Sequence, residues 1–121
     1  MIRIIAAAAV LFSTGAVAQS VTVVANTPEA LGAHSIMTGD YAGAEQQIMT
    51  ADVSPFDPAR QINFGVVLAM TGRAAEAQKL FHQVLVEEPV DVTVASGATI
   101  SSREAAERAL DYFGQKALAL K

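Results

Sequence analysis

The feature that most constrains this chain is a pattern of small residues that returns after 33 positions. Glycine and alanine stand at matching places in two consecutive segments, and a proline closes each segment, the second one residue out of register. A period of this length is typical of stacked helical repeats, in which each unit is one pair of helices. Such repeats form binding surfaces, so the pattern predicts a class of activity without naming a partner. The recurring pairs are Gly32 and Gly65, Gly39 and Gly72, Ala44 and Ala77, and Pro55 and Pro89.

The first 18 residues have the composition of a cleaved secretory signal. Arg3 gives a short basic start, residues 4–12 are apolar, and Ala16 and Ala18 are small residues before Gln19. We therefore expect cleavage after Ala18 and a periplasmic or secreted protein. A membrane anchor is the alternative, but polar residues interrupt the apolar stretch, which is shorter than the roughly 20 apolar residues of a spanning helix.

The remaining residues, 19–121, are enough for one small domain. The chain has no cysteine, so no disulfide supplements the core. It carries 8 basic and 12 acidic residues, for a net charge of −4, and the basic residues are scattered. This charge disfavours binding to nucleic acid, because a phosphate backbone is recognised by clustered positive charge. No later stretch is apolar for long enough to span a membrane.

Capping residues and glycines divide residues 25–90 into four helices. Asn26 or Thr27 can cap the first helix, and Gly39 can end it with a positive φ. Asp57 can cap the third helix, with Pro58 in its first turn. The expected helices are 28–37, 41–51, 58–71 and 73–87.

The last third of the chain departs from the repeat. Residues 90–94 alternate in the manner of a half-buried strand, and residues 21–24 are a second short valine-rich stretch. The two stretches either pair with each other or present an edge to a partner. Ser101 and Glu104 have the spacing of a capping box, which predicts a final helix over about 102–120.

On these residues the chain resembles the tetratricopeptide repeat family. The first unit, 25–57, keeps the family's small residues. The second unit, 58–90, is the closer match, through Phe64, Gly65, Leu68, Gly72, Ala77, Phe81 and Pro89. The resemblance implies an all-α fold, in which two helix hairpins stack as a short right-handed superhelix that the C-terminal helix caps. It also implies a non-enzymatic scaffold that binds another envelope protein or a peptide.

In that family the first helix of each pair lines a concave groove. Here the groove is mostly apolar, which favours an apolar peptide. A clamp for a terminal carboxylate is not expected, because Asn63 alone represents the polar residues that form one. The groove residues that the resemblance implies are Ala33, Ile36, Met37, Ile62, Asn63, Val66, Ala69 and Met70.

Two alternatives to peptide binding remain for this groove. The C-terminal helix carries an apolar stripe at Leu110, Phe113 and Ala117 that can fill the groove in cis. Alternatively, a pocket at Met37 and Met70 can carry a small apolar ligand. An open groove would favour a peptide, and an enclosed cavity would favour a ligand.

Residues for catalysis or metal binding do not cluster in the sequence. His34 and His82 are the only histidines, fall in different units and have no cysteine to join them in a metal site. Ser96, Ser101 and Ser102 have no neighbouring base that would activate a hydroxyl. We therefore expect no cofactor and no enzymatic activity.

Overall fold

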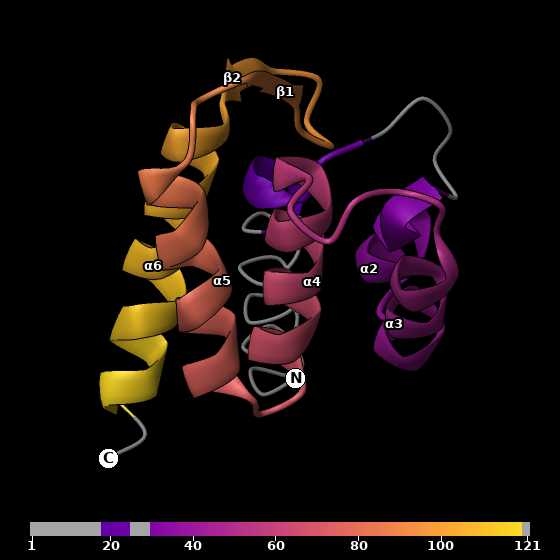
Figure 1. The fold of residues 1–121 in the computed structure, drawn as a ribbon. Coiled ribbons are helices and arrows are strands. Elements are labelled where there is room, and N and C mark those ends of the chain that lie inside the picture. Colours follow the sequence, from indigo (N-terminus) through magenta and orange to yellow (C-terminus); the bar gives the residue numbers. More distant parts are fainter. Residues whose placement is uncertain (1–17, 25–29, 120–121) are drawn as a thin grey trace, which may run out of the picture.

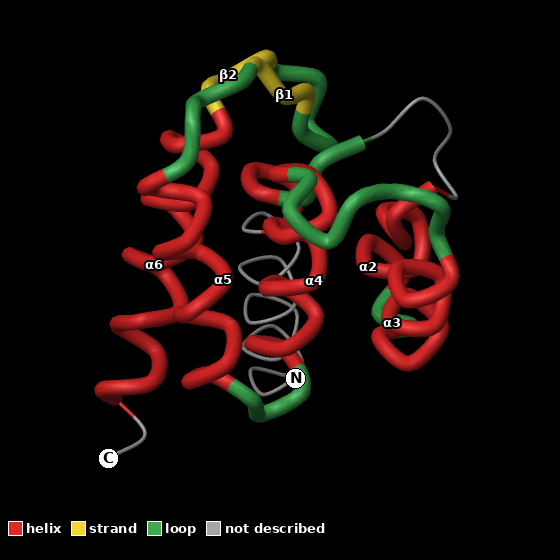
Figure 2. The backbone as a smooth tube through the Cα atoms, viewed as in Figure 1, coloured by secondary structure: helices red, strands yellow, loops and turns green. Residues whose placement is uncertain are grey.

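The computed structural model describes residues 18–24 and 30–119, and helices make up most of them (Figures 1 and 2). The predicted mainly-α class is confirmed. Residues 1–17 of the predicted signal and the predicted cap at Asn26 or Thr27 lie outside the described residues. The elements are a 3-10 turn η1 (Ala30–Gly32), helices α2 (Ala33–Thr38), α3 (Tyr41–Thr50), α4 (Pro58–Met70) and α5 (Ala74–Val86), strands β1 (Asp91–Thr93) and β2 (Thr99–Ser101), and helix α6 (Ser102–Ala119).

The helix pairs α2–α3 and α4–α5 are joined by the same turn, displaced by 33 residues. Gly39 and Gly72 both have a positive φ, 85° and 81°, as the sequence predicts. The hydroxyls of Thr38 and Thr71 donate to the carbonyls three and four residues earlier, at 2.8–3.3 Å. Because these contacts are local, each turn is set by its own short sequence.

Small residues bring the helices of each pair close together. A Cβ added to Gly32 would lie 2.9 Å from the backbone oxygen of Ala44, and one added to Gly65 would lie 2.5 Å from Cε1 of Phe81. Either distance is too short for a real side chain. The absence of a side chain at Gly32 and Gly65 therefore permits this close approach.

The predicted first helix over 28–37 is confirmed from Ala33 onward and is wrong at Leu31 and Gly32. Leu31 has a left-handed φ of 59° and Gly32 follows with 70°, so regular helix starts only at Ala33. This conformation is unusual for leucine. It is held in place because the Leu31 side chain is buried and its carbonyl accepts a hydrogen bond from Asn63 at 3.1 Å.

The two valine-rich stretches pair with each other. Val23 forms an antiparallel bridge with Val94, and β1 pairs on its other side with β2. Strand β2 was not predicted. It adds to a sheet that lies over one end of the helices, beyond the starts of α4 and α6 (Figure 1).

The capping box predicted at Ser101 and Glu104 is also wrong. The Ser101 hydroxyl accepts from the N–H of Arg103 at 3.1 Å, and the Glu104 carboxylate pairs with Arg108 at 2.7 Å. The N–H of Ser102 donates to the carbonyl of Val90 at 2.7 Å, which extends the β1–β2 ladder into the start of α6. The strand pairing therefore sets the start of this helix.

The core lies between α4, α5 and α6 and continues to the α2–α3 pair (Figure 1). Phe81 of α5 is fully buried and stacks on Phe113 of α6 with the ring centroids 6.2 Å apart. Arg73, at the start of α5, bridges to Glu45 of α3 at 2.5 Å and so links the two pairs. Within residues 18–24 and 30–119, no helix has the length and apolar character needed to cross a bilayer.

Candidate functional site: an open groove beside strand β1

Most of the predicted groove residues lie inside the molecule. They come from α2 and α4, as expected, but five of the eight are at most 2% exposed. A partner can contact these five side chains only if a covering segment moves, and peptide binding at this face stays a prediction. The buried residues are Ala33, Ile36, Ile62, Asn63 and Val66; Met37, Ala69 and Met70 are partly buried.

Asn63 shows what occupies its part of the predicted groove. Its amide oxygen accepts from the N–H of Val23 and its amide nitrogen donates to the carbonyl of Val23, both at 2.8 Å. The same nitrogen donates to the carbonyl of Leu31. The chain's own backbone at residues 22–24, which follows a helical turn at residues 18–21, is therefore bound at this position.

The C-terminal helix covers another part of the same face. Phe113 is buried and Leu110 is partly buried against the core, whereas the side chain of Ala117 lies outside the described residues. A cavity of about 10 Å³ remains there, which is room for about one water molecule. Burial raises the pKa of the Tyr41 phenol beside it. The cavity is lined by Ala18, Ile36, Tyr41, Val66, Met70, Tyr112 and Phe113.

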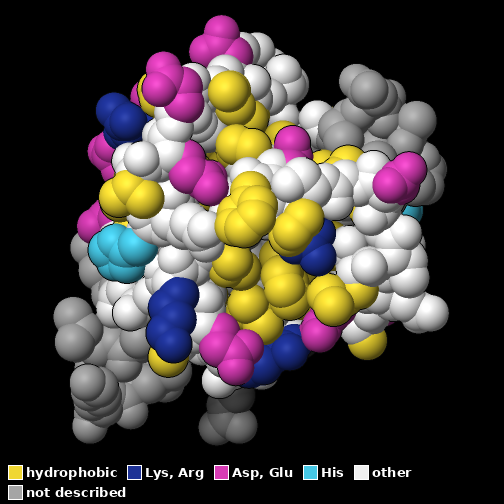
Figure 3. Space-filling model, in the orientation of Figure 1, with side chains coloured by type: hydrophobic (Ala, Val, Ile, Leu, Met, Phe, Trp, Pro, Cys, Tyr) yellow, Lys and Arg dark blue, Asp and Glu magenta, His cyan; other side chains and the backbone are white. Residues whose placement is uncertain are grey.

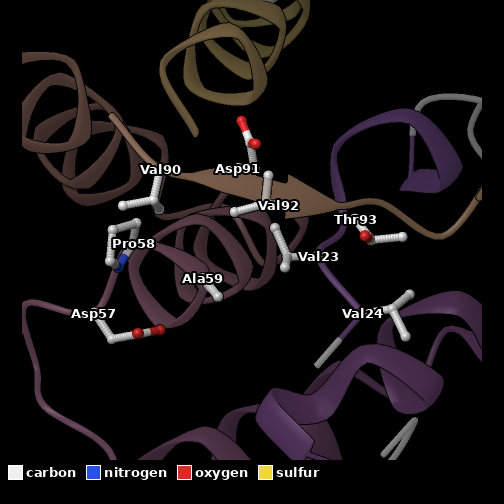
Figure 4. Close-up of a pocket in the computed structure, with 9 residues that line it drawn as sticks. All are labelled: Val23, Val24, Asp57, Pro58, Ala59, Val90, Asp91, Val92 and Thr93. Atoms are coloured by element: carbon white, nitrogen blue, oxygen red, sulfur yellow. The ribbon is translucent and has the colours of Figure 1, made fainter. Parts of the chain in front are cut away.

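A much larger hollow lies elsewhere, beside β1. It has a volume of about 520 Å³, opens to solvent, and lies between residues 23–24, the outer edge of β1 and the first turn of α4. Figure 4 shows Val23, Val92 and Ala59 near its floor, with Asp57 and Pro58 on one side and Val24 and Thr93 on the other. We call this hollow the β1 groove.

The backbone of Asp91 faces the β1 groove. In the β1–β2 ladder, the hydrogen bonds join Val94 to Ala98 and Val90 to Ser102, so alternate residues of β1 point their N–H and C=O groups outward. The outward carbonyl of Thr93 accepts from the N–H of Val24 at 2.8 Å. For the outward groups of Asp91, the described residues provide no partner.

The side chains around the β1 groove are apolar with two carboxylates. Val23 and Val92 are buried and form the apolar floor. Asp57 caps α4 by accepting from the N–H of Arg60 at 3.0 Å, and Asp91 is exposed. Among the described residues, no basic side chain lines the groove. The groove can therefore take an extended, apolar segment that carries positive charge.

The residues considered for chemistry are not gathered into a site. His34 and His82 are exposed on α2 and α5. The hydroxyls of Ser101 and Ser102 accept hydrogen bonds from backbone N–H groups. Within the part of the chain that the structure describes, no three His, Asp or Glu side chains come together in an arrangement that would hold a metal ion.

Sequence reasoning missed the β1 groove because its residues come from three distant segments. Val24, Ala59 and Asp91 carry no local motif, and they meet only when residues 21–24 pair beside β1. In the sequence, the one feature that pointed to this groove was the pair of valine-rich stretches, because their pairing ends at Val24 and leaves the rest of the outer edge of β1 unpaired.

Comparisons with protein-family models, curated proteins and solved structures find no match to this chain.

Proposed function

We propose that this protein is a non-enzymatic interaction module, exported to the periplasm or secreted, that binds an extended segment of another envelope protein in the β1 groove. The observation that carries the proposal is the outward backbone of Asp91 at the edge of an open groove of about 520 Å³. An extended peptide can pair with such an edge and continue the sheet.

The groove also favours a particular composition in the partner. In an added strand, every second side chain would point toward Val23, Val92 and Ala59, where small branched apolar residues fit. The residues between them would lie near Asp57 and Asp91, which favour lysine or arginine. The net charge of −4 also favours a positively charged partner, and it disfavours nucleic acid as a partner.

The scaffold that presents the groove is tetratricopeptide-like in this proposal. Supporting it are the identical turns at Gly39 and Gly72 and the close approaches at Gly32 and Gly65, each displaced by 33 residues. We propose that the two helix pairs stack with the right-handed sense of that family. Export rests on the sequence of residues 1–18, with Gln19 as the expected first residue after cleavage.

The alternative function, a carrier of a small apolar ligand, has less support, because the cavity at its expected site is too small. Pockets that hold small ligands measure about 300 Å³ or more. The enclosed cavity at Met70 measures about 10 Å³, and Met37 does not line it. Peptide binding is therefore the better-supported proposal.

Selection of a phage-displayed library of random peptides on the purified protein tests strand addition. We expect enriched peptides to alternate apolar and basic residues and to shift the NMR amide signals of Val24, Ala59 and Asp91. Asp91→Pro removes the outward N–H but no β1–β2 hydrogen bond, and proline is tolerated on a strand edge. It should lower affinity at least roughly tenfold, the effect of about 1.4 kcal/mol.

Thr99→Pro is the matched control. Thr99 stands opposite Thr93 in the ladder, and its N–H points away from β1 on the far edge of the sheet. This variant should bind the selected peptides as the unchanged protein does. The proposal is wrong if no peptide is enriched, if the signals shift at another surface, or if the two proline variants lose affinity equally.

A further inference from the structure

A second surface carries exposed apolar side chains, at the end of α3 and in its connection to α4. Among the described residues, Met49 is 59% exposed, Val53 41% and Phe56 63%. Hydrophobic side chains gather over the middle of this face (Figure 3). We call Met49, Val53, Phe56 and the partly buried Phe64 of α4 the apolar patch. Exposed groups of this kind mark interaction surfaces.

Arg60 lies on the apolar patch without a carboxylate partner. Its guanidinium carbon is 5.7 Å from the ring centroid of Phe64, and its Nη2 donates to the Met49 sulfur at 3.9 Å. The two ion pairs of the described residues are Glu45–Arg73 and Glu104–Arg108, and neither includes Arg60. The ring and the sulfur hold this cation in place while its charge stays unneutralised.

The residue next to Val53 in the chain carries a negative charge that forms no ion pair among the described residues. Asp52 directly precedes Val53, is exposed, and takes part in neither ion pair of the described residues. Apolar side chains with one cation and one anion beside them form a self-complementary surface. A two-fold axis through the patch would set each charge opposite its complement.

We propose that a second copy of this chain covers the apolar patch in an isologous dimer. Arg60 of each copy pairs with Asp52 of the other, and Met49, Val53, Phe56 and Phe64 pack between them. The copies dock through the α3–α4 connection, where Phe56 and Arg60 flank Asp57, Pro58 and Ala59 at one side of the β1 groove. The dimer proposal is argued from the patch residues and does not rest on the function proposed for the β1 groove.

Sedimentation velocity over a concentration series tests the dimer through two charge reversals. The unchanged protein should pass from monomer to dimer as its concentration rises. Arg60→Asp and Asp52→Arg each place like charges opposite each other at both contacts, so each should raise the dissociation constant of the dimer roughly tenfold or more. An equimolar mixture of the two variants should restore the dimer. In the mixed dimer, the two acidic side chains of one variant, at positions 52 and 60, would face the two basic side chains of the other.

Two further variants separate the apolar contribution from a general effect on the surface. Phe56→Ser should weaken the dimer, whereas Val86→Ser, at an 83% exposed position of α5, should leave it unchanged. Circular dichroism checks that each variant is folded. The proposal is overturned if the unchanged protein stays monomeric, if the reversed variants dimerise as well as it does, or if their mixture forms no dimer. Binding of a different protein at the patch by a monomer would also overturn it.

Discussion

Asn63 makes both backbone hydrogen bonds of Val23, a residue 40 positions earlier in the chain. The amide group accepts from the Val23 N–H and donates to its carbonyl, as a neighbouring strand would. Asn63 is fully buried, so these bonds are shielded from water. This one side chain therefore fixes an extended N-terminal segment to helix α4.

Replacing Asn63 should destabilise the protein strongly. Asn63→Ala leaves the N–H of Val23 and the carbonyls of Val23 and Leu31 buried without their amide partner. We expect the free energy of unfolding to fall by about 3 kcal/mol, measured by urea denaturation. Gln46→Ala, on the exposed face of α3, should change it by less than about 0.5 kcal/mol. A loss below about 1 kcal/mol in Asn63→Ala would contradict the assigned bonds.

Two glycines in helices should respond in opposite ways to alanine. At Gly65 a Cβ would lie 2.5 Å from the buried ring of Phe81, so Gly65→Ala should cost about 1–3 kcal/mol through overpacking. At Gly114 a Cβ meets nothing within 4 Å, so Gly114→Ala should stabilise the protein by up to about 1 kcal/mol. Thermal unfolding of both variants measures the difference, and shifts of the same sign would contradict this packing.

Thr22 offers a stabilising substitution. Its hydroxyl oxygen is buried and has no hydrogen-bond partner in the described residues. Thr22→Val keeps the shape and removes the unsatisfied group, so the free energy of unfolding should rise by about 1 kcal/mol. Urea denaturation measures this gain, and a loss would show that the hydroxyl is bound.

The ion pair between Glu45 and Arg73 should make stability depend on pH. The hydrogen bond from Arg73 holds the pKa of the Glu45 carboxyl below its usual 4.5. The carboxyl therefore has a lower pKa when folded than when unfolded, so its stabilising effect is complete well above pH 4.5. The effect is lost as the pH falls through the folded-state pKa.

Glu45→Gln isolates this effect. Because both side chains are about one-third exposed, we expect the variant to be less stable at pH 7 by only about 0.5 kcal/mol. Urea denaturation over a pH series should show the difference between the two proteins vanishing in acid. A difference that persists below the folded-state pKa would contradict an ionic origin.

Features set by neighbouring residues were predictable from the sequence. Gly39 and Gly72 end helices because glycine tolerates a positive φ, and Asp57 caps α4 through an N–H three residues later. Features that depend on distant residues were not. The break at Leu31 depends on Asn63, and the start of α6 depends on the pairing of Ser102 with Val90.

In the candidate site, too, features set by neighbouring residues were predictable and features that depend on distant residues were not. Periodicity placed Ile62 and Val66 correctly on one face of α4, but it cannot show which chain segment covers that face. The covering segment at residues 21–24 has only a weak valine pattern, and the β1 groove exists because that segment passes beside β1.

The bridge between Val23 and Val94 also has a consequence for biosynthesis. A chain still emerging from the ribosome contains Val23 long before it contains Val94. Until Val94 is released, the early segment has the Asn63 amide and the apolar core as docking points, but no strand to pair with. Completion of the fold must therefore wait for nearly the whole polypeptide, and truncation before β1 would leave its beginning unpaired.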